Sequence, residues 1–430
     1  MASPHLVFDE WEDEYAERNE HLRRSAVRDL FAAVSRPNVI GLSGGSPDIS
    51  SLPLDQVADC AKNVVDEFGL KALQYGSSEG RPEMRRVVAD MLAEDGIDVD
   101  IDQIIITNGS QQALDFMGRV FIDPGDTIIV EGPSYLGALQ AFSAYMPDVR
   151  VVPMDDDGMR MDKLEELLEE LGSGGAKFIY TIPNFQNPAG VTMTLERRKR
   201  LLELAHEYQI TVIEDDPYGK LRFEGEHVPP LKSMDPNVIY LGTTSKIFAP
   251  GLRLAWCVAP KPIIEKINLS EQGAGLCVSA FTQCLCEQYF TKTDWKGTLK
   301  KSQAIYRSRR DALIGALEEY FPEEATWTHP EGGLFVWVTL PPYFDTMQMM
   351  SAALERGVAY VPGSNCYPDG QGKSSMRLAF SYEPEENLRE GVRRLADTIN
   401  DRLELYRAFM KAGALPKAAG TAEASDPEGN

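Results

Sequence analysis

The sequence has few histidines and cysteines, a deficit of basic residues and no long apolar run. Its 43 Lys and Arg residues stand against 66 Asp and Glu residues, a net charge of −23. This balance argues against nucleic-acid binding, which needs a basic face. No apolar run approaches the ~20 residues of a membrane helix, and the acidic N-terminus lacks a basic-then-apolar signal pattern. We therefore expect neither a nucleic-acid partner nor a membrane partner.

The six cysteines and five histidines show no spacing typical of a zinc site, so we expect no metal. Several of the cysteines lie within apolar runs, as reduced core residues do. We therefore expect a cytoplasmic protein. A chain of 430 residues exceeds a typical single core, so two domains are expected.

Apolar, β-branched runs predict seven strands between residues 103 and 259, and helical patterns lie between most of them. The strands are predicted at 103–107, 127–131, 149–153, 178–182, 210–214, 238–241 and 253–259. The helices are predicted at 54–68, 82–95, 111–121, 136–145, 162–171 and 195–208. This alternation predicts an α/β fold with a mostly parallel seven-stranded sheet covered by helices. Ligands of such sheets bind at the carboxyl ends of the strands.

The pattern changes after about residue 265 and predicts a smaller α+β domain. Helices are expected at 278–292, 295–320, 346–356 and 384–411, with strands at 332–338, 358–361 and 376–381. We divide the chain into an N-terminal arm (1–24), a helix and loop that pack with the small domain (25–45), a large domain (46–295), a small domain (296–414) and a disordered tail (415–430). The helix of the second segment is expected from Ser25, as its cap, to about Val34.

One lysine, Lys246, lies among small hydroxyl residues between two buried strand patterns. An unpaired buried ammonium is expensive, but an amine that forms a Schiff base with a carbonyl cofactor is no longer a free ammonium. The hydroxyls of Thr243 and Ser245 and the guanidinium of Arg253 can bind a phosphate. Together these groups describe a site for pyridoxal phosphate. The alternative is a lysine on a solvated loop.

Further polar residues follow other predicted strand ends. Asp215 can pair with the pyridine nitrogen of the cofactor and keep the ring protonated, while Tyr218 supplies a phenol near the ring hydroxyl. Asn187 is held extended before Pro188, so its amide can reach the same hydroxyl. The ordinary alternatives are a solvated acidic turn and an Asn-Pro turn.

Three more residues complete the pattern. Ser110 is expected to cap a helix whose N-terminus forms a phosphate site, and Tyr135 can stack on a flat ring. Arg377 lies alone in an apolar strand, where a substrate carboxylate would match it bidentately. Their alternatives are an ordinary helix cap, a core tyrosine and a structural ion pair.

With these motifs the chain resembles the class I and II aminotransferases, which are pyridoxal-phosphate enzymes of fold type I. Within that family it is similar to the 2-aminoadipate, kynurenine and multi-substrate aminotransferases, and to the aminotransferase-like half of certain bacterial winged-helix regulators. The motifs follow the family order from about Ser25 to about Leu405: LSGGSPD, QYGSSEGRPEMR, TNGSQQALD, PNFQNPAGVTM, IEDDPYGKL, TTSKIFAPGLRLAW, HPEGGLFVW, YVPGSNCY and MRLAFS. Two departures are Ala189, where the family often has Thr, and Cys366, at a position that is often aromatic.

The resemblance implies a role for each matched residue. Lys246 is the Schiff-base lysine, Asp215 pairs with the pyridine nitrogen and Tyr135 stacks on the ring. Asn187 and Tyr218 contact the ring hydroxyl, and Arg377 holds the substrate carboxylate with help from Asn187 and the backbone near Gly45. The residues implied to bind the phosphate are Ser110, Gln111, Thr243, Ser245 and Arg253, with Tyr75 reaching the phosphate of the neighbouring subunit in a homodimer with shared sites.

We expect a transaminase that moves an amino group between an L-amino acid and a 2-oxo acid in a ping-pong cycle, with Lys246 as general base and then acid. One alternative keeps the cofactor but changes the reaction to that of a β-lyase, decarboxylase or oxidase. Another is a non-catalytic, cofactor-binding regulatory module, although the segment before Ser25 is too short for a DNA-binding domain. Substrate choice stays open, since Arg23, Arg24 and Arg28 either meet an acidic substrate or are solvated helix charges.

Overall fold

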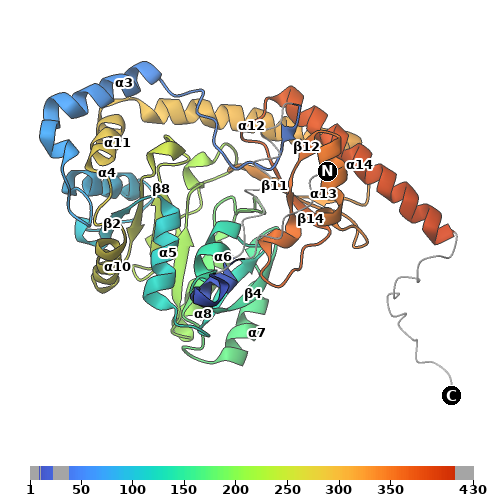
Figure 1. The fold of residues 1–430 in the computed structure, drawn as a ribbon, viewed down its shortest axis with the longest axis horizontal. Coiled ribbons are helices and arrows are strands. Elements are labelled where there is room, and N and C mark those ends of the chain that lie inside the picture. Colours follow the sequence, from blue (N-terminus) through green and yellow to red (C-terminus); the bar gives the residue numbers. More distant parts are fainter. Residues whose placement is uncertain (1–8, 10, 23–37, 412–430) are drawn as a thin grey trace.

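The structure is a computed structural model that describes residues 9, 11–22 and 38–411 (Figure 1). The helix predicted over 25–34, the arginines at 23, 24 and 28, and the tail predicted from 415 lie outside the described residues. In the described part of the chain, no helix combines the length and the apolar character needed to cross a membrane.

A large sheet of eight strands forms the centre of the molecule, in the order β2-β9-β8-β7-β6-β3-β4-β5. The strands are β2 (Ile104–Thr107), β3 (Thr127–Gly132), β4 (Asp148–Asp155), β5 (Gly158–Met159), β6 (Phe178–Thr181), β7 (Thr211–Asp215), β8 (Ile239–Thr243) and β9 (Ala255–Val258). Strands β4, β3, β6, β7 and β8 pair in parallel, whereas β9 is antiparallel to both of its neighbours. The seven predicted strands are confirmed. The eighth, β5, has two residues at the edge of the sheet, too few to give a strand pattern.

The sheet is buried on both faces because alternate strand residues point into two separate cores. In β3, Ile128 and Val130 belong to the larger core, which also takes residues of α5 (Ser110–Phe121) and α6 (Leu136–Ser143). Ile129 belongs to the second core, with residues of α7 (Met161–Leu171) and α8 (Leu195–Glu207). This two-sided burial explains why the central strands are continuous apolar runs rather than alternating ones.

Further helices and short helical turns lie along the rest of the described chain. They are α3 (Leu54–Asn63), α4 (Pro82–Ala93), α9 (Leu231–Met234), α10 (Lys261–Ala274) and α11 (Ala280–Lys292), with shorter helical turns at η1 (Glu12–Glu14), α1 (Arg18–His21), η4 (Ile101–Gln103), η5 (Gly219–Leu221), η6 (Pro250–Leu252) and η7 (Gly363–Cys366). The helix predicted over 54–68 is α-helical only to Asn63. It continues as a π-helical turn, η2 (Val64–Phe68), and a 3₁₀ turn, η3 (Gly69–Leu73).

A long helix, α12 (Trp295–Tyr320), runs from the large sheet to a smaller C-terminal sheet (Figure 1). That sheet is antiparallel, in the order β10-β11-β14-β13. Its strands are β10 (Thr326–Trp327), β11 (Phe335–Thr339), β13 (Val361–Pro362) and β14 (Ser375–Ala379), packed with α13 (Thr346–Glu355) and α14 (Glu385–Lys411). Near the N-terminus, β1 (Ile40–Gly41) pairs in parallel with β12 (Val358–Ala359). The residues after β1 are therefore held beside the C-terminal sheet.

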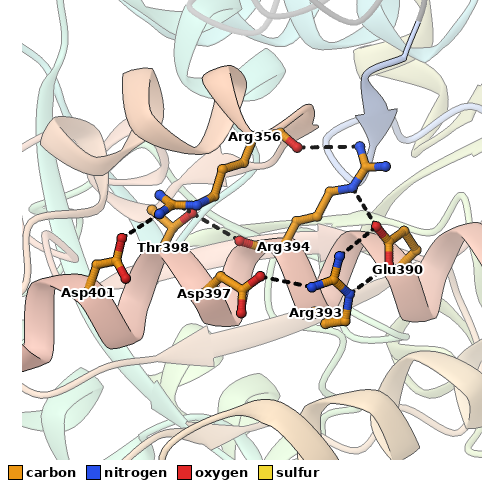
Figure 2. Close-up of polar contacts among 7 residues, drawn as sticks. All are labelled: Arg356, Glu390, Arg393, Arg394, Asp397, Thr398 and Asp401. Atoms are coloured by element: carbon orange, nitrogen blue, oxygen red, sulfur yellow. Dashed lines mark hydrogen bonds and ion pairs between the residues drawn. The ribbon is translucent and has the colours of Figure 1, made fainter.

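Arginine side chains of α14 hold the turn that leads into β12 (Figure 2). Glu390 accepts hydrogen bonds from Arg394 and Arg393, and Arg393 also contacts Asp397. The guanidinium of Arg394 donates to the carbonyl oxygens of Arg356 and Gly357, at 3.3 and 3.1 Å. It also donates to the carbonyl oxygen of residue 38, just before β1, at 3.3 Å. The network therefore joins α14, β12 and β1.

Candidate active site

A cavity of about 640 Å³ opens where the parallel strands β3, β6, β7 and β8 end. All the predicted site residues line it except Tyr75, which is 80% exposed and lies elsewhere. The lining residues are Gly45, Ser46, Pro47, Ser110, Gln111, Tyr135, Leu136, Gly137, Gln140, Ile182, Asn187, Asp215, Pro217, Tyr218, Thr243, Ser245, Lys246, Pro250, Arg253, Phe335 and Arg377. The loops after the strand ends and the C-terminal sheet thus contribute to one site.

Lys246 lies in the loop after β8, and the backbone of that loop is held from both sides. Thr244 accepts a hydrogen bond from the backbone N–H of Phe248 and donates its own N–H to Leu254. The Lys246 Nζ donates to the carbonyl oxygen of Gly45 over 2.8 Å. Burial, with a further contribution from two arginines of the cavity, lowers the pKa of Lys246 to about 8. This amine therefore loses its proton more readily than an exposed lysine does, and its neutral form is the nucleophile.

Asp215 is the last residue of β7 and is almost fully buried. Its Oδ2 accepts a hydrogen bond from the Tyr180 hydroxyl over 2.8 Å, while its Oδ1 is buried with no hydrogen-bond partner in the described structure. Burial raises the pKa of this carboxyl group to about 7. An unpaired buried carboxylate oxygen is costly, and a cationic donor in the cavity would satisfy it.

Arg377, Asn187 and Tyr218 are joined by hydrogen bonds across the cavity wall. Arg377 Nη1 donates to Asn187 Oδ1 over 2.8 Å, and Asn187 Nδ2 donates to the Tyr218 hydroxyl over 3.3 Å. Arg377 Nη2 donates to the carbonyl oxygen of Ser43. Its guanidinium lies 4.2 Å from the centre of the Phe335 ring, and its buried Nε has no hydrogen-bond partner among the described residues. Burial lowers the pKa of Arg377, so a carboxylate in the cavity would offset the cost of this buried cation.

Arg253 approaches the N-terminus of α5 because the residue before that helix is glycine. A Cβ at Gly109 would collide with Nη2 of Arg253, and the φ of +80° at Gly109 disfavours other residues. Nearby, the hydroxyl of Thr243 donates to Ser245 Oγ over 3.0 Å. These donors and the helix N-terminus form a cradle suited to a phosphate.

The prediction that Ser110 caps α5 is wrong. Gly109 takes the cap position, and Ser110 is the first helical residue, with its side chain on the cavity. The cap position here has a positive φ, which a serine adopts poorly. Gln111 also lines the cavity, but its amide donates to the carbonyl oxygen of Gly137 over 2.7 Å. Burial raises the pKa of Tyr135, so its phenol stays protonated in the cavity.

Sequence reasoning missed two residues that contact the predicted ones. Tyr180 lies inside an apolar strand and was indistinguishable from a core tyrosine, and it contacts Asp215 only because β6 and β7 pair in register. Phe335 begins β11 and reads as an ordinary strand residue, yet its ring packs against Arg377 and, edge to face, against Tyr218. Its one signal in the sequence is its place in the motif HPEGGLFVW.

The donors and acceptors of the cavity fit pyridoxal phosphate. Asp215 Oδ1 is an unpaired acceptor suited to the ring nitrogen, and the Arg253 cradle offers several donors to a phosphate. Lys246 forms no ion pair with a described carboxylate, so its amine is free to react with a carbonyl group. Arg377 keeps an unpaired N–H for a second anion.

The family model described as aminotransferase class I and II matches residues 37–395. The aromatic-amino-acid aminotransferase 1 of Thermococcus litoralis is 45% identical over 94% of this chain and 97% of its own length. The crystal structure of a multiple substrate aminotransferase from Thermococcus profundus superposes with a TM-score of 0.88, at 45% identity, covering 92% of this chain and 100% of that one. A kynurenine aminotransferase from Pyrococcus horikoshii, solved in complex with PMP and with kynurenine as substrate, superposes with a TM-score of 0.88 at 44% identity, covering 92% and 98%.

Proposed function

Because the chain belongs to the class I and II aminotransferase family and is a pyridoxal-phosphate-dependent aminotransferase, we propose that Lys246 holds its cofactor and moves the proton of the reaction. The reaction transfers an amino group between an amino acid and a 2-oxo acid. When bound, pyridoxal phosphate supplies a carbonyl group that takes up the amine and a cationic ring that accepts the electrons left at the α-carbon. We assign Asp215 to the ring nitrogen, Asn187 and Tyr218 to the ring hydroxyl, and Tyr135 to the ring face. The residues assigned to the phosphate are Ser110, Gln111, Thr243, Ser245 and Arg253.

Arg377 binds and orients the substrate. Its buried, unpaired Nε and its cationic charge suit the α-carboxylate, and the contacts with Asn187 and Ser43 keep the guanidinium from rotating. A carboxylate fixed there points the α C–H bond of the amino acid in one direction. Fixing this geometry before reaction lowers the entropic part of the barrier. Gly45 contributes through its carbonyl oxygen, which holds Lys246.

Lys246 Nζ removes the α-proton and returns it as the conjugate acid. Its pKa of about 8 places the neutral, proton-accepting form within reach of ordinary cellular pH. Burial, together with its neighbours Arg377 and Arg253, disfavours the protonated form, so a proton taken up by Nζ is readily given back. This supports a single amine acting as base and then as acid.

One observation carries the assignment of roles: a lysine with a depressed pKa and an unpaired buried carboxylate oxygen line the same cavity. A decisive experiment replaces Lys246 with Ala. The control variant, Lys292→Ala, removes a remote lysine and keeps the amine of Lys246. Lys246→Ala should lose the visible absorbance of bound cofactor and about 10²–10⁴-fold or more in turnover. Full activity of Lys246→Ala would refute the assignment.

A panel of amino donors with 2-oxoglutarate and pyruvate as acceptors tests the reaction itself. A transaminase forms a 2-oxo acid and a new amino acid in equal amounts, whereas a β-lyase, decarboxylase or oxidase does not. We propose neutral, bulky donors of the aromatic type. The lining residues not assigned to cofactor or carboxylate are all uncharged: Ser46, Pro47, Leu136, Gly137, Gln140, Ile182, Pro217, Pro250 and Phe335. The relative from T. litoralis is named for aromatic amino acids.

We also propose a homodimer whose partner supplies Tyr75 to the phosphate. Large apolar side chains of η2 and η3, together with Tyr75, are exposed at 53–84%: Val65, Leu70, Leu73 and Tyr75. Exposed apolar side chains clustered in one segment are typical of an interface.

The division into a large domain (46–295) and a small domain (296–414), with 25–45 packing on the latter, is part of the proposal. Six cysteines without disulfides support a cytoplasmic location.

A further inference from the structure

Three side chains outside the cavity, of which Asp216 is half-buried, form a line of hydrogen bonds. Arg198 Nη2 donates to Asn184 Oδ1 over 2.7 Å, and Asn184 Nδ2 donates to Asp216 Oδ1 over 3.1 Å. Arg198 is completely buried and Asn184 nearly so. None of the three lines the cavity, and none belongs to the machinery assigned above. We call these residues the triad.

The triad joins the two loops that carry Asn187 and Tyr218. Asn184 follows β6 and stands three residues before Asn187, while Asp216 directly follows Asp215. The Asp216 carboxylate accepts the backbone N–H of Gly219 over 2.9 Å and the Tyr240 hydroxyl over 3.1 Å. The turn that presents Tyr218 is thus fixed by Asp216, and Asn184 fixes that carboxylate to the neighbouring loop.

Arg198 anchors the other end of the triad. From α8 it donates to the carbonyl oxygens of Pro183, Met193 and Pro229, at 2.9, 3.0 and 3.0 Å. Its guanidinium therefore spans both ends of the loop that contains Asn184. Burial lowers the pKa of Arg198, and among the described residues no carboxylate forms an ion pair with it. A buried cation whose hydrogen bonds all go to uncharged oxygens contributes little net stability, so the main effect of Arg198 is to hold this loop in one geometry.

We propose that Asn184 is a positioning residue that sets the distance between Asn187 and Tyr218, and hence the two contacts assigned to the ring hydroxyl. The direction of its hydrogen bonds matters: its oxygen accepts from Arg198, and its nitrogen donates to Asp216. The amide thus links a cation to an anion without adding charge. This inference rests on the proposed function, since it concerns residues assigned to the cofactor.

The substitution Asn184→Asp tests the direction of the bonds without changing the shape of the side chain. A carboxylate at this position still accepts from Arg198, but it has no proton for Asp216, and two like charges then face each other. The turn that carries Tyr218 is expected to move away from Asn187. Adding Asp216→Asn to the same chain removes the repulsion and returns a donor to this contact, with the direction of the bond reversed. Because the same Asp216 Oδ1 also accepts the backbone N–H of Gly219, the double variant is expected to restore the position of the turn only in part.

Two measurements report on the cofactor contacts apart from turnover. For Asn184→Asp, the dissociation constant of pyridoxal phosphate should rise by about tenfold or more, the loss of one hydrogen bond to a charged group. The pH midpoint of the visible absorbance of bound cofactor should move to higher pH, because donors to the ring oxygen favour its anionic form. The double variant should return both quantities toward those of the unsubstituted protein.

Gln288→Glu is a matched control, because it is also a buried amide-to-acid change beside a carboxylate, that of Glu67 at 3.0 Å, but on α11 and away from the cavity. It should leave the midpoint unchanged. If Asn184→Asp fails to fold, Asn184→Ala removes the amide without adding charge and should move the midpoint in the same direction. An unchanged midpoint in the folded variant, or a double variant no closer to normal than the single one, would overturn the inference. If the unsubstituted protein showed no visible absorbance after addition of pyridoxal phosphate, the proposed function itself would be overturned.

Discussion

Arg377 Nη1 donates to Asn187 Oδ1 across 2.8 Å, which joins the C-terminal sheet to a loop of the large sheet. The same amide donates its Nδ2 to the Tyr218 hydroxyl. Both ends of Asn187 are therefore engaged, one with the proposed substrate-binding cation and one with a proposed cofactor ligand. A change at this amide should affect substrate and cofactor together.

Replacing Asn187 with Asp should weaken substrate binding. The new carboxylate would pair with Arg377 and neutralise the cation that the substrate carboxylate needs, so the KM for amino acids should rise by about 10–100-fold. The lost donor to Tyr218 should also weaken cofactor binding. Steady-state kinetics with one amino donor and a titration of cofactor absorbance measure the two effects. Asn268→Asp, on α10 and outside the cavity, serves as the control, and an unaltered KM in Asn187→Asp would argue against Arg377 as the carboxylate site.

Replacing Phe335 with Leu should raise KM more than it lowers kcat. The ring lies under the guanidinium of Arg377, and a Cβ at Gly45 would come within 2.8 Å of its Cζ, so the ring fills the space between the two residues. A cation held over a desolvated aromatic face is stabilised by up to about 2 kcal/mol, which predicts a KM increase of up to about thirtyfold. Phe344→Leu removes another buried ring, which lies outside the cavity, and should leave KM unchanged. Equal losses in both variants would mean that Phe335 acts only through stability.

The fold could be predicted where consecutive residues are all buried and therefore all apolar. Strands β3, β6, β7 and β8 are continuous apolar runs because both faces of the sheet are covered, and their positions were predicted within two residues. Helix α10 was missed, since its buried positions, Ile264, Ile267 and Glu271, include a charged residue and give a weak apolar stripe. The break after Asn63 was also missed, because a single π-helical turn is too short to give a pattern of its own in the sequence.

The candidate site could be predicted where each residue stands at a strand end, because the carboxyl ends of parallel strands meet at one edge. Lys246, Asp215 and Asn187 are of this kind. The residues that support them could not be predicted in the same way. Tyr180 and Arg198 reach the site through strand pairing and helix packing between segments far apart in sequence. Their contacts depend on the register of those segments, which local sequence does not specify.

Asp215 should make the cofactor-free protein less stable as the pH rises. Its pKa is about 7 in the folded chain against 3.8 for the ordinary group. Between these values the folded chain keeps a proton that the unfolded chain has lost, so the free energy of unfolding falls with rising pH. Below about pH 4 the group has no effect, and above about pH 7 the penalty is complete. Asp215→Asn removes this penalty, worth on the order of 1–4 kcal/mol.

The test compares Tm of the cofactor-free protein and of Asp215→Asn at pH 5 and pH 8. The Tm of Asp215→Asn minus the Tm of the unsubstituted chain should be larger at pH 8 than at pH 5. Saturation with pyridoxal phosphate should abolish this gain, since a cationic ring nitrogen beside the carboxylate favours its charged form. The same difference in Tm at both pH values would show that Asp215 is not a neutral, buried acid in the cofactor-free protein.

The exposed apolar segment should hold two copies of the chain together. Leu70 and Leu73 are 84% and 67% exposed in the single chain, and burying a leucine contributes about 1.5–3 kcal/mol. The double substitution Leu70→Asp with Leu73→Asp should therefore raise the dimer dissociation constant by at least about 100-fold and give a monomer in sedimentation velocity. Because Tyr75 would no longer reach the other subunit, cofactor affinity should fall with it. Leu405→Asp, 56% exposed on α14, should leave the dimer intact. A double variant that still sediments as a dimer would place the interface elsewhere, whereas a monomer that binds cofactor normally would exclude a shared phosphate site.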